Sequence, residues 1–280
     1  MTGSNRLLSE EGLLDWFQTG RRHAVNGCER VACSGGDVFV KWAPTPRILA
    51  ESRGLDALEE RLEGSVPAPR ACAMVSADVS AMALPWMDHA PWTNAHWEHL
   101  AEVLASLSLP HGTPFGWTRD NFIGPTPQVN TQTQDWVEFV RWSRLVPMLD
   151  RLNLRAAAEP FLQELDRWVP RAPIPSLCHG DLWMGNVIPG NDNTCILIDP
   201  AVHVGDVWAD VAMLMLFGSP PGRFHAALAD KAGSGPPTAE CMTVYQMYHV
   251  LNHAILFGGA YIDQARRQIN MLNRALSNRQ

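Results

Sequence analysis

The sequence contains no apolar run approaching the roughly 18 residues that a membrane-spanning helix needs. Its first 22 residues carry acidic side chains within the apolar stretch and offer no small-residue cleavage site, so they do not resemble a signal peptide. No block of like charge occurs, and the net charge of −7 is opposite to the usual balance of nucleic-acid-binding proteins. These absences favour a cytoplasmic protein that acts on a small molecule, with no nucleic-acid or membrane partner.

Motifs of several other protein classes are also missing. The six cysteines form no CxxC pair, and no histidine follows at zinc-finger spacing, so we expect buried, reduced thiols rather than a zinc site. The chain has no G-x-x-x-x-G-K-[ST] phosphate loop, no G-x-S-x-G nucleophile elbow and no G-x-G-x-x-G after a strand. The corresponding classes of NTPase, hydrolase and dinucleotide-binding enzyme are therefore disfavoured.

Lysine is nearly absent from the chain. Only two lysines, Lys41 and Lys231, occur among 22 basic residues. Lys41 lies inside the apolar run VFVKW. Because an ammonium is a compact point charge and a guanidinium is a planar fork, a site that needs one phosphate-directed ammonium cannot exchange them freely. Lys41 is therefore a candidate for contact with a phosphate.

The first part of the chain has the texture of a small β-rich lobe. The apolar spacing predicts an amphipathic helix over 7–19, short strands broken by Gly and Asn over 22–42, a helix over 47–64 and two strands within 67–88. We therefore predict a first lobe that covers residues 1–88.

The rest of the chain is mostly helical. Helical patterns begin at about residue 93 and include one over 135–152. They are interrupted by a polar, Pro- and Gly-rich loop over 111–130 and by residues 176–201, which read as loop, strand, turn, strand and loop. No internal repeat is present. A β-rich lobe of residues 1–88 followed by a larger, mainly helical lobe of residues 89–280 predicts an α+β fold with two lobes.

The most informative segment is SLCHGDLWMGNVIPGNDNTCILIDPA, residues 176–201. Four residues separate Asp181 from Asn186, and the turn signal PGNDN lies between VI and TCILI, which predicts a β-hairpin. The return strand of this hairpin would bring Asp199 beside Asp181 and Asn186. Two carboxylates and an amide oxygen that converge in this way suit Mg²⁺, and one Asp is left to accept a proton from a hydroxyl.

The same order of residues is the catalytic pattern of protein kinases, with H-x-D, four residues, N and a later metal-binding Asp. Kinases also need a Lys on a strand that holds the nucleotide phosphates and a Glu on a helix that orients this Lys. Lys41 on VFVKW and Glu51 on the next predicted helix fit these roles. The combination predicts a phosphotransferase that uses ATP and Mg²⁺.

The segment that would cover the nucleotide is less clear. NGCERVACSGG, residues 26–36, supplies glycines but no kinase pattern. Gly27 and Cys28 either cap the phosphates or belong to a plain hairpin. A thiol at position 28 also raises the hypothesis of a redox switch, in which Cys28 is oxidised to an intersubunit disulfide. The sequence does not determine the oligomeric state.

Several strings resemble the fructosamine/ketosamine 3-kinase family, which belongs to the protein-kinase-like superfamily together with aminoglycoside and choline kinases. These strings lie between about Lys41 and Tyr261 and are HGDLWMGN, GWTRDNFIGPTPQVN with DWVEFV, IDPA, DVAMLMLFG and YQMYHVLNHAILFGGAY. The combination is specific, since aminoglycoside kinases more often have His-Pro where Trp183 and Met184 stand. The resemblance implies a protein-kinase-like fold and ATP-dependent phosphorylation of the sugar 3-hydroxyl of a ketosamine, free or protein-bound. The 3-phosphate would then decompose and free the amine.

The resemblance also implies roles for individual residues. Asp181 would be the catalytic base, Asn186 and Asp199 would bind Mg²⁺, and Lys41 with Glu51 would anchor the phosphates. The segment that resembles the hinge against adenine consists of Leu84, Pro85, Trp86 and Met87. The residues expected to hold the 111–130 loop in place are Asn121, Gln128 and Asn130.

Two positions bear on the substrate. Trp183, beside the base, resembles the aromatic residue that shapes the sugar site. Trp208 stands two residues before Asp210, where the family usually has an acid, so Trp208 is expected to affect substrate choice if that acid contacts the substrate. A further departure from the family pattern concerns the phosphate loop, where Asn26 stands in place of the first glycine.

These departures leave two alternatives open. One is a small-molecule kinase of the aminoglycoside or choline type on the same fold. The other is a pseudokinase that binds nucleotide without chemistry, although the intact set of Lys41, Asp181, Asn186 and Asp199 argues against it.

Overall fold

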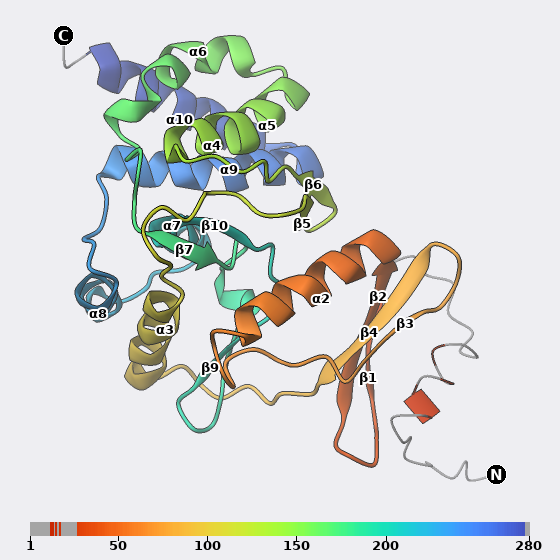
Figure 1. Ribbon diagram of the computed structural model, residues 1–280. Coiled ribbons are helices and arrows are strands. Elements are labelled where there is room, and N and C mark those ends of the chain that lie inside the picture. The colour runs from red at the N-terminus through yellow and green to blue at the C-terminus, as the bar shows by residue number, and fades with distance from the viewer. Residues whose placement is uncertain (1–11, 14, 16, 18–26, 278–280) are drawn as a thin grey trace.

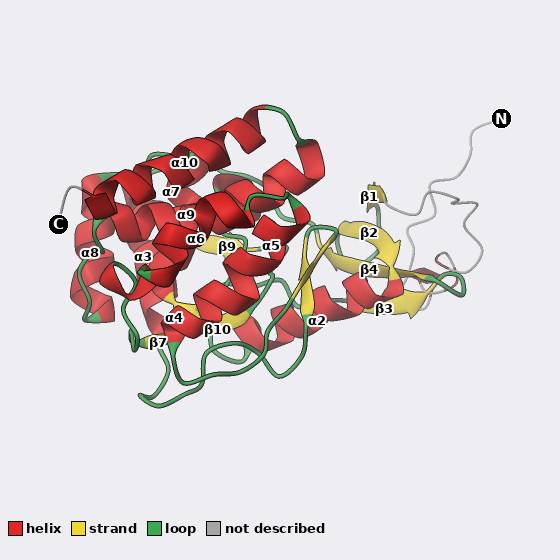
Figure 2. Cartoon of the chain, turned by 90° about the horizontal axis from the view of Figure 1, so that it is seen from above, coloured by secondary structure: helices red, strands yellow, loops and turns green. Residues whose placement is uncertain are grey.

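The computed structural model describes residues 12–13, 15, 17 and 27–277 (Figure 1). Most of the helix predicted over 7–19, and Asn26, lie outside these residues. The strands and the helix of residues 27–85 lie at one end of the molecule and most of the other helices at the other, as Figures 1 and 2 show. The two-lobed α+β architecture is therefore confirmed, while the boundary between residues 88 and 89 stays a prediction.

The small lobe is an antiparallel sheet of order β1-β2-β4-β3 with one helix against it. Alternate residues of a strand face opposite sides of a sheet, and β4 shows this directly. Ala81 and Ala83 pack on one face, while Met82 and Leu84 share the main core with Leu55 of the helix. The elements are β1 (Gly27–Val31), β2 (Val38–Pro44), α2 (Thr45–Glu59), β3 (Ala71–Met74) and β4 (Val79–Pro85).

The large lobe consists mainly of helices that bury one continuous apolar core. Trp136 lies within this core, stacked on Phe139 at 5.2 Å between ring centroids. The helices are α3 (Asn94–Ser106), α4 (Trp136–Phe139), α5 (Val146–Arg151), α6 (Arg155–Gln163), α7 (Val207–Phe217), α8 (Gly222–Ala232), α9 (Ala239–Phe257) and α10 (Ala260–Ser277). Short 3₁₀ turns occur at Leu165–Arg167 and Met184–Asn186.

The continuous helix expected over 135–152 is interrupted. A π-helical turn, Val140–Leu145, separates α4 from α5, and Pro147 follows in the first turn of α5. Because proline has no N–H to donate, a regular ladder of hydrogen bonds cannot pass through this position.

Three short antiparallel pairs lie between the helices. The predicted hairpin is confirmed, with Val187 opposite Leu197 and Pro189 opposite Cys195. Two further pairs differ from the sequence prediction. One lies within the 111–130 loop, and the other begins with residues 175–178, where the sequence predicts a loop. The strands are β5 (Asn121–Ile123) with β6 (Thr126–Gln128), β7 (Pro175–Cys178) with β10 (His203–Asp206), and β8 (Val187–Pro189) with β9 (Cys195–Leu197).

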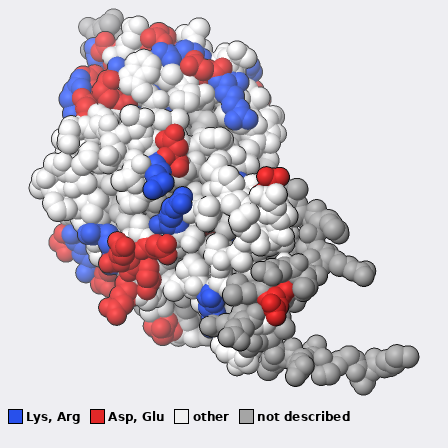
Figure 3. Space-filling view, turned by 45° about the vertical axis from the view of Figure 1, so that its right-hand side comes forward, with Lys and Arg blue, Asp and Glu red and all other residues white. Residues whose placement is uncertain are grey.

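The surface carries its charges in small groups. On the face in Figure 3, acidic and basic side chains lie close together, separated by wide uncharged areas. Among the described residues, no helix is both long and apolar enough to cross a membrane.

Candidate active site

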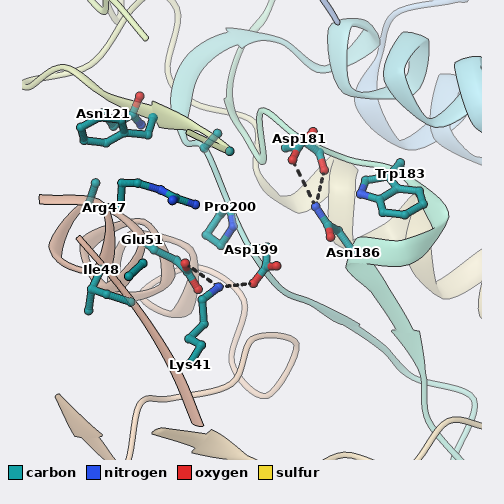
Figure 4. Close-up of a pocket in the computed structure, with 15 residues that line it drawn as sticks. Lys41, Arg47, Ile48, Glu51, Asn121, Asp181, Trp183, Asn186, Asp199 and Pro200 are labelled. Atoms are coloured by element: carbon teal, nitrogen blue, oxygen red, sulfur yellow. Dashed lines mark hydrogen bonds and ion pairs between the residues drawn. The ribbon is translucent and has the colours of Figure 1, made fainter. Parts of the chain in front are cut away.

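A cleft of about 290 Å³ lies where the two lobes meet. The small lobe contributes Lys41 from β2 and Glu51 from α2. The large lobe contributes Asp181, Asn186 and Asp199 from the segments on either side of the β8–β9 hairpin. Figure 4 shows these side chains turned toward one another across the cavity. Residues distant in the sequence are thus brought together as the spacing predicts.

Lys41 joins the two walls of the cleft through two short ion pairs. Its Nζ lies 2.6 Å from Glu51 Oε2 and 2.7 Å from Asp199 Oδ1. Burial acts to lower the pKa of Lys41, but its attraction to the two carboxylates outweighs this effect and raises the pKa. Lys41 is therefore held as a charged ammonium, in a position fixed by both lobes.

The carboxylates around Lys41 outnumber it. Burial raises the pKa of Glu51 to about 7, Lys41 opposes this shift, and the negative charge of Asp199 adds to it. Glu51 Oε1 is buried without a hydrogen-bond partner among the described residues. The site therefore has an excess of negative charge that a bound cation would offset.

The loop that carries Asp181 is fixed by backbone hydrogen bonds to a buried carboxylate. Asp210 on α7 accepts hydrogen bonds from the backbone N–H groups of His179, at 2.7 Å, and Gly180, at 2.8 Å. Gly180 has φ +82°, and a Cβ atom there would collide with the carbonyl oxygen of Ala201. Only glycine fits this turn, which explains the Gly of HGD.

His179 supports the same loop as a neutral ring. Burial lowers the pKa of His179 to about 4. Its Nε2 lies 2.8 Å from the carbonyl oxygen of Ile198, and its Nδ1 accepts from the backbone N–H of Asp181 at 3.3 Å. A neutral imidazole with the proton on Nε2 satisfies both contacts. His179 therefore links the loop before Asp181 to the end of the hairpin before Asp199.

Asp181 lies in the cleft with an unusual protonation equilibrium. Burial, followed by the nearby charge of Asp199, raises the pKa of Asp181 to about 7, and Asn186 opposes this shift. The side-chain amide of Asn186 donates to the backbone oxygen of Asp181 at 2.9 Å and to Asp181 Oδ2 at 3.4 Å. A carboxylate of this kind can exchange a proton near neutral pH.

Asp199 adopts a backbone conformation that L-residues rarely take. Its φ is +56°, in the left-handed region, and it is followed by Pro200. Such strain persists where the surrounding structure requires it and is concentrated at functional sites. Here it turns the carboxylate of Asp199 toward Lys41 (Figure 4).

The donor set fits a magnesium ion. Asp199 supplies a carboxylate and Asn186 an amide oxygen, while the described residues contain no group of three or more His, Cys, Asp or Glu that could hold a metal alone. Mg²⁺ commonly takes one or two carboxylates and completes its shell with waters and substrate phosphates. An incomplete oxygen set that faces a cavity is therefore the expected arrangement.

Trp183 lines the same cleft, as predicted, and remains 40% exposed. Its ring lies so close to Gly185 that a Cβ atom at position 185 would collide with it. The glycine of GN in HGDLWMGN therefore gives the tryptophan ring room beside the backbone.

The predicted nucleotide-covering and hinge residues lie outside the residues that line this cavity. Gly27 packs under Trp42, because a Cβ atom there would lie 2.7 Å from the Trp42 ring, and Cys28 is exposed on β1 opposite Lys41. Leu84 and Pro85 end β4, and the backbone N–H of Trp86 donates to Asp37 at 2.9 Å. Contacts of these residues and of Met87 with nucleotide stay predictions, as does a redox role of Cys28.

The position of Trp208 gives no support to its expected effect on substrate choice, which stays a prediction. Trp208 is 2% exposed, its Nε1 donates to Ser234 Oγ at 3.2 Å, and its ring stacks on His225. It does not line the cleft. Asp210, two residues further along α7, reaches the catalytic loop, whereas Trp208 packs away from it because residues two apart on a helix do not share a face.

The loop residues perform the supporting role that was predicted. Asn121 donates to the carbonyl oxygen of Val202 at 2.8 Å, and Gln128 donates to that of Ala201 at 3.0 Å. Asn130 donates to Asn121 Oδ1 at 2.8 Å. This network ties the β5–β6 hairpin to the segment that follows Asp199.

Sequence reasoning missed two contributors. Asp210 was noted only as part of a motif, and its contact with the catalytic loop follows from tertiary structure alone. Arg47 also lines the cleft, one helical turn before Glu51, and its side chain extends toward Pro200 in Figure 4. The i, i+4 spacing from Glu51 could have indicated that Arg47 faces the same side of α2.

Comparisons with known proteins agree with this geometry. The fructosamine kinase family model matches residues 17–275. A protein of Synechocystis, provisionally named a ketoamine kinase, is 34% identical over 79% of this chain and 76% of its own length. YniA of Escherichia coli K12, with the same provisional name, is 31% identical over 96% of this chain and 97% of its own.

Solved structures share the fold. A crystal structure from Thermobifida fusca, provisionally named a fructosamine-3-kinase, has a TM-score of 0.77 at 31% identity and covers 90% of this chain and 91% of its own. An aminoglycoside phosphotransferase in complex with ADP and hygromycin B has a TM-score of 0.65 at 13% identity, covering 95% and 97%. The first is similar in sequence and fold, the second in its kinase-like fold alone. The chain belongs to the fructosamine kinase family, whose members are phosphotransferases that act on a hydroxyl group.

Proposed function

We propose that this protein transfers the γ-phosphoryl group of ATP to the sugar 3-hydroxyl of a ketosamine in a magnesium-dependent reaction. The observation that carries the proposal is the meeting of Lys41, Glu51, Asp181, Asn186 and Asp199 in one cleft. Relatives named ketoamine kinase, and a protein-ribulosamine 3-kinase of Arabidopsis thaliana that is 28% identical over 92% of this chain, support the choice of acceptor.

The side of the cleft formed by the small lobe, the N-lobe, would bind the nucleotide. Phosphoryl transfer passes through a loose transition state, so the protein acts mainly by positioning groups and by offsetting charge. Lys41, held between Glu51 and Asp199, would contact the phosphate oxygens. Asn186 and Asp199 would hold Mg²⁺, which when bound offsets the negative charge of the phosphates.

The side of the cleft formed by the large lobe, the C-lobe, would activate the acceptor. Asp181 would orient the 3-hydroxyl and take its proton as the oxygen attacks the γ-phosphorus, while ADP leaves with the β–γ bridging oxygen. A positioned base of this kind is worth roughly 10²–10⁴ in rate. Trp183, exposed at the edge of the cleft, would contact the sugar.

The phosphorylated product defines the biological outcome of this proposal. A ketosamine 3-phosphate decomposes and frees the amine, so the reaction would remove sugars from glycated amines or proteins. This is a role in deglycation that the resemblance implies.

The test is mass-spectrometric detection of phosphate on ribulose-lysine and fructose-lysine incubated with the protein and Mg·ATP. We expect a product that gains one phosphate and is absent with Asp181→Ala. Aminoglycosides and choline in the same panel test the alternative acceptors, and a product from these compounds alone would contradict the proposal. Thermal stabilisation by Mg·ATP without product from any acceptor would instead indicate a pseudokinase.

A further inference from the structure

A row of aromatic side chains leads away from the catalytic cleft over the large lobe. Neighbouring rings are in contact at each step. The ring centroids are 6.3 Å apart for Trp183 and Phe217, 5.1 Å for Phe217 and His253, and 5.6 Å for His253 and Phe257. Tyr261 closes the far end, 5.0 Å from His253 and 6.2 Å from Phe257. We call these five residues the aromatic row.

The aromatic row is unusually open to solvent for side chains of this kind. Trp183 is 40% exposed, Phe217 is 41% exposed and Phe257 is 67% exposed. Single exposed apolar residues are normal, but a connected group next to a functional cleft marks a binding surface. Trp183 belongs both to the aromatic row and to the catalytic cleft, because it lines the cleft that contains Asp181.

The backbone fixes the far end of the row. Gly258 and Gly259 have φ values of +64° and +52°, in the region that favours glycine, and they reverse the chain between α9 and α10. This reversal places Phe257 at the end of one helix and Tyr261 at the start of the next. Phe257 is exposed and Tyr261 is half-buried, and the turn between them is made by the two glycines.

The electrostatic surroundings favour a positively charged partner. Residues 207–221 and 235–265, which carry most of the row, contain no lysine or arginine. Arg266 and Arg267 follow directly on α10, and Arg266 Nη1 lies 3.6 Å from the carboxylate of Asp263. At the cleft end, Trp183 and Asp181 line the same cavity. Aromatic faces attract alkylammonium groups, and their area also packs against methylene chains.

From these observations we infer that the aromatic row binds the amine-bearing part of the substrate, the side chain and flanking backbone of a glycated lysine within a peptide. The inference rests on the proposed function, because it takes the sugar to be at Asp181. The ketosamine nitrogen is a protonated secondary amine. It would lie near Trp183 and Phe217, the lysine methylenes would follow the row, and the peptide backbone would reach Phe257 and Tyr261.

This inference predicts that contacts at the far end depend on the length of the amine. A ketosamine of methylamine ends near Trp183, so it cannot reach Phe257. A ketosamine on the central lysine of a glycine-flanked pentapeptide can reach it. The row therefore acts as a specificity determinant for peptide-bound over small ketosamines.

The test measures kcat and KM for both ribulose adducts with the wild-type protein and with Phe257→Ala, Phe257→Leu and the double variant Phe257→Ala/Tyr261→Ala. We expect the double variant to raise KM for the peptide about 10-fold more than KM for the methylamine adduct. Phe257→Leu keeps apolar area but loses the ring. The difference between its effects on KM for the two substrates should be smaller than in the double variant. Trp142→Ala is the matched control, because Trp142 is 51% exposed and lies outside the row.

Binding is measured in parallel by titrating the glycated peptide into protein loaded with a non-hydrolysable ATP analogue. Equal effects of the double variant on both adducts, with turnover intact, would overturn the inference and leave the proposed function standing. Absence of turnover for every ketosamine would refute the proposed function. In that case, peptide binding that is unaffected by the double variant overturns the aromatic row as a peptide site, and binding that is lost supports it.

Discussion

The two walls of the cleft are held in place by different forces. On the C-lobe side, the loop before Asp181 is fixed by backbone N–H groups that donate to the buried carboxylate of Asp210. On the N-lobe side, Lys41 is positioned by ion pairs with Glu51 and Asp199. The C-lobe wall is thus part of the folded core, whereas the N-lobe wall depends on charges that a nucleotide and a cation would rearrange.

This difference separates residues that set the reaction from residues that set stability. Charge changes on the N-lobe side should act on nucleotide binding and leave the fold intact. Changes behind the catalytic loop should weaken the fold and the reaction together. The following predictions test this separation, from the largest expected effect to the smallest.

Replacing either functional carboxylate should stop the reaction, in two distinguishable ways. Asp199→Ala removes a proposed metal ligand and one partner of Lys41, so it should abolish both turnover and Mg·ATP binding. Asp181→Asn removes only the proposed base and should lower kcat roughly 10²–10⁴-fold while Mg·ATP still binds. Isothermal titration and steady-state kinetics provide the two readouts. Normal Mg·ATP affinity in Asp199→Ala would refute the metal assignment.

Removing the carboxylate behind the loop should cost both stability and activity. Asp210→Asn leaves only one oxygen to accept two backbone N–H groups, which should cost about 1–3 kcal/mol and reduce kcat. Asp206→Asn is a matched control, since Asp206 is also buried but accepts from Tyr245 and Trp208 rather than from the loop. Thermal unfolding should show that both variants are less stable than the wild-type protein. An equal fall in kcat for both variants at matched stability would contradict a specific role of Asp210.

Loosening Lys41 should affect the nucleotide. Glu51→Ala removes one of its two partners, and we expect KM for ATP to rise about 10-fold, with Tm lowered little. Glu51→Gln keeps a hydrogen-bond acceptor and should have a smaller effect. A large loss of Tm with unchanged KM for ATP would show that the pair is structural.

The contribution of Asp181 and Asp210 to the stability of the apo protein should fall as pH rises. Burial raises the pKa values of Asp181 and Asp210 to about 7, so the folded state binds these protons more tightly than the unfolded state does. Their contribution is present below the ordinary carboxyl pKa and is lost as pH rises through about 7. Buried His179, whose pKa is lowered to about 4, contributes in the opposite sense, so the change in Tm itself is not diagnostic. We expect the Tm of the wild-type protein minus that of Asp181→Asn to fall between pH 5 and pH 8. An identical slope in the variant would exclude this contribution of Asp181.

Trp208 should have the smallest influence on the reaction. Since it lies outside the cleft, Trp208→Phe should change KM for any ketosamine less than about twofold, while the lost contact with Ser234 destabilises the fold by about 1 kcal/mol. A selective change in substrate preference would show that α7 transmits an effect to the site.

The parts of the site that the sequence predicts are those carried by local spacing. Asp181, Asn186 and Asp199 share one short segment, and the turn between them fixes how the strands fold back, so their convergence could be derived. Lys41 and Glu51 could be placed because the pattern of Asp181, Asn186 and Asp199 indicates a kinase, which needs a lysine on a strand and a glutamate on the next helix.

What the sequence does not predict depends on packing between distant elements. The expected effect of position 208 on the substrate comes from the family resemblance, but Trp208 stacks on His225 of α8, a contact that no local pattern predicts. The contact of Asp210 with the catalytic loop and the aromatic row assembled from α7, α9 and α10 arise in the same way. The β5–β6 hairpin was missed because its strands, Asn121–Ile123 and Thr126–Gln128, are too short to show a period.

The central claim is that this cleft phosphorylates the 3-hydroxyl of a ketosamine with Asp181 as the base. The most direct measurement is ³¹P–¹H correlation NMR of the product formed from ribulose-lysine and Mg·ATP. We expect a phosphorus signal coupled to the sugar H3 proton with the wild-type protein, and formation of this product slowed roughly 10²–10⁴-fold with Asp181→Asn. A phosphorus signal coupled to another sugar proton, or the same 3-phosphate formed at an undiminished rate by Asp181→Asn, would contradict it.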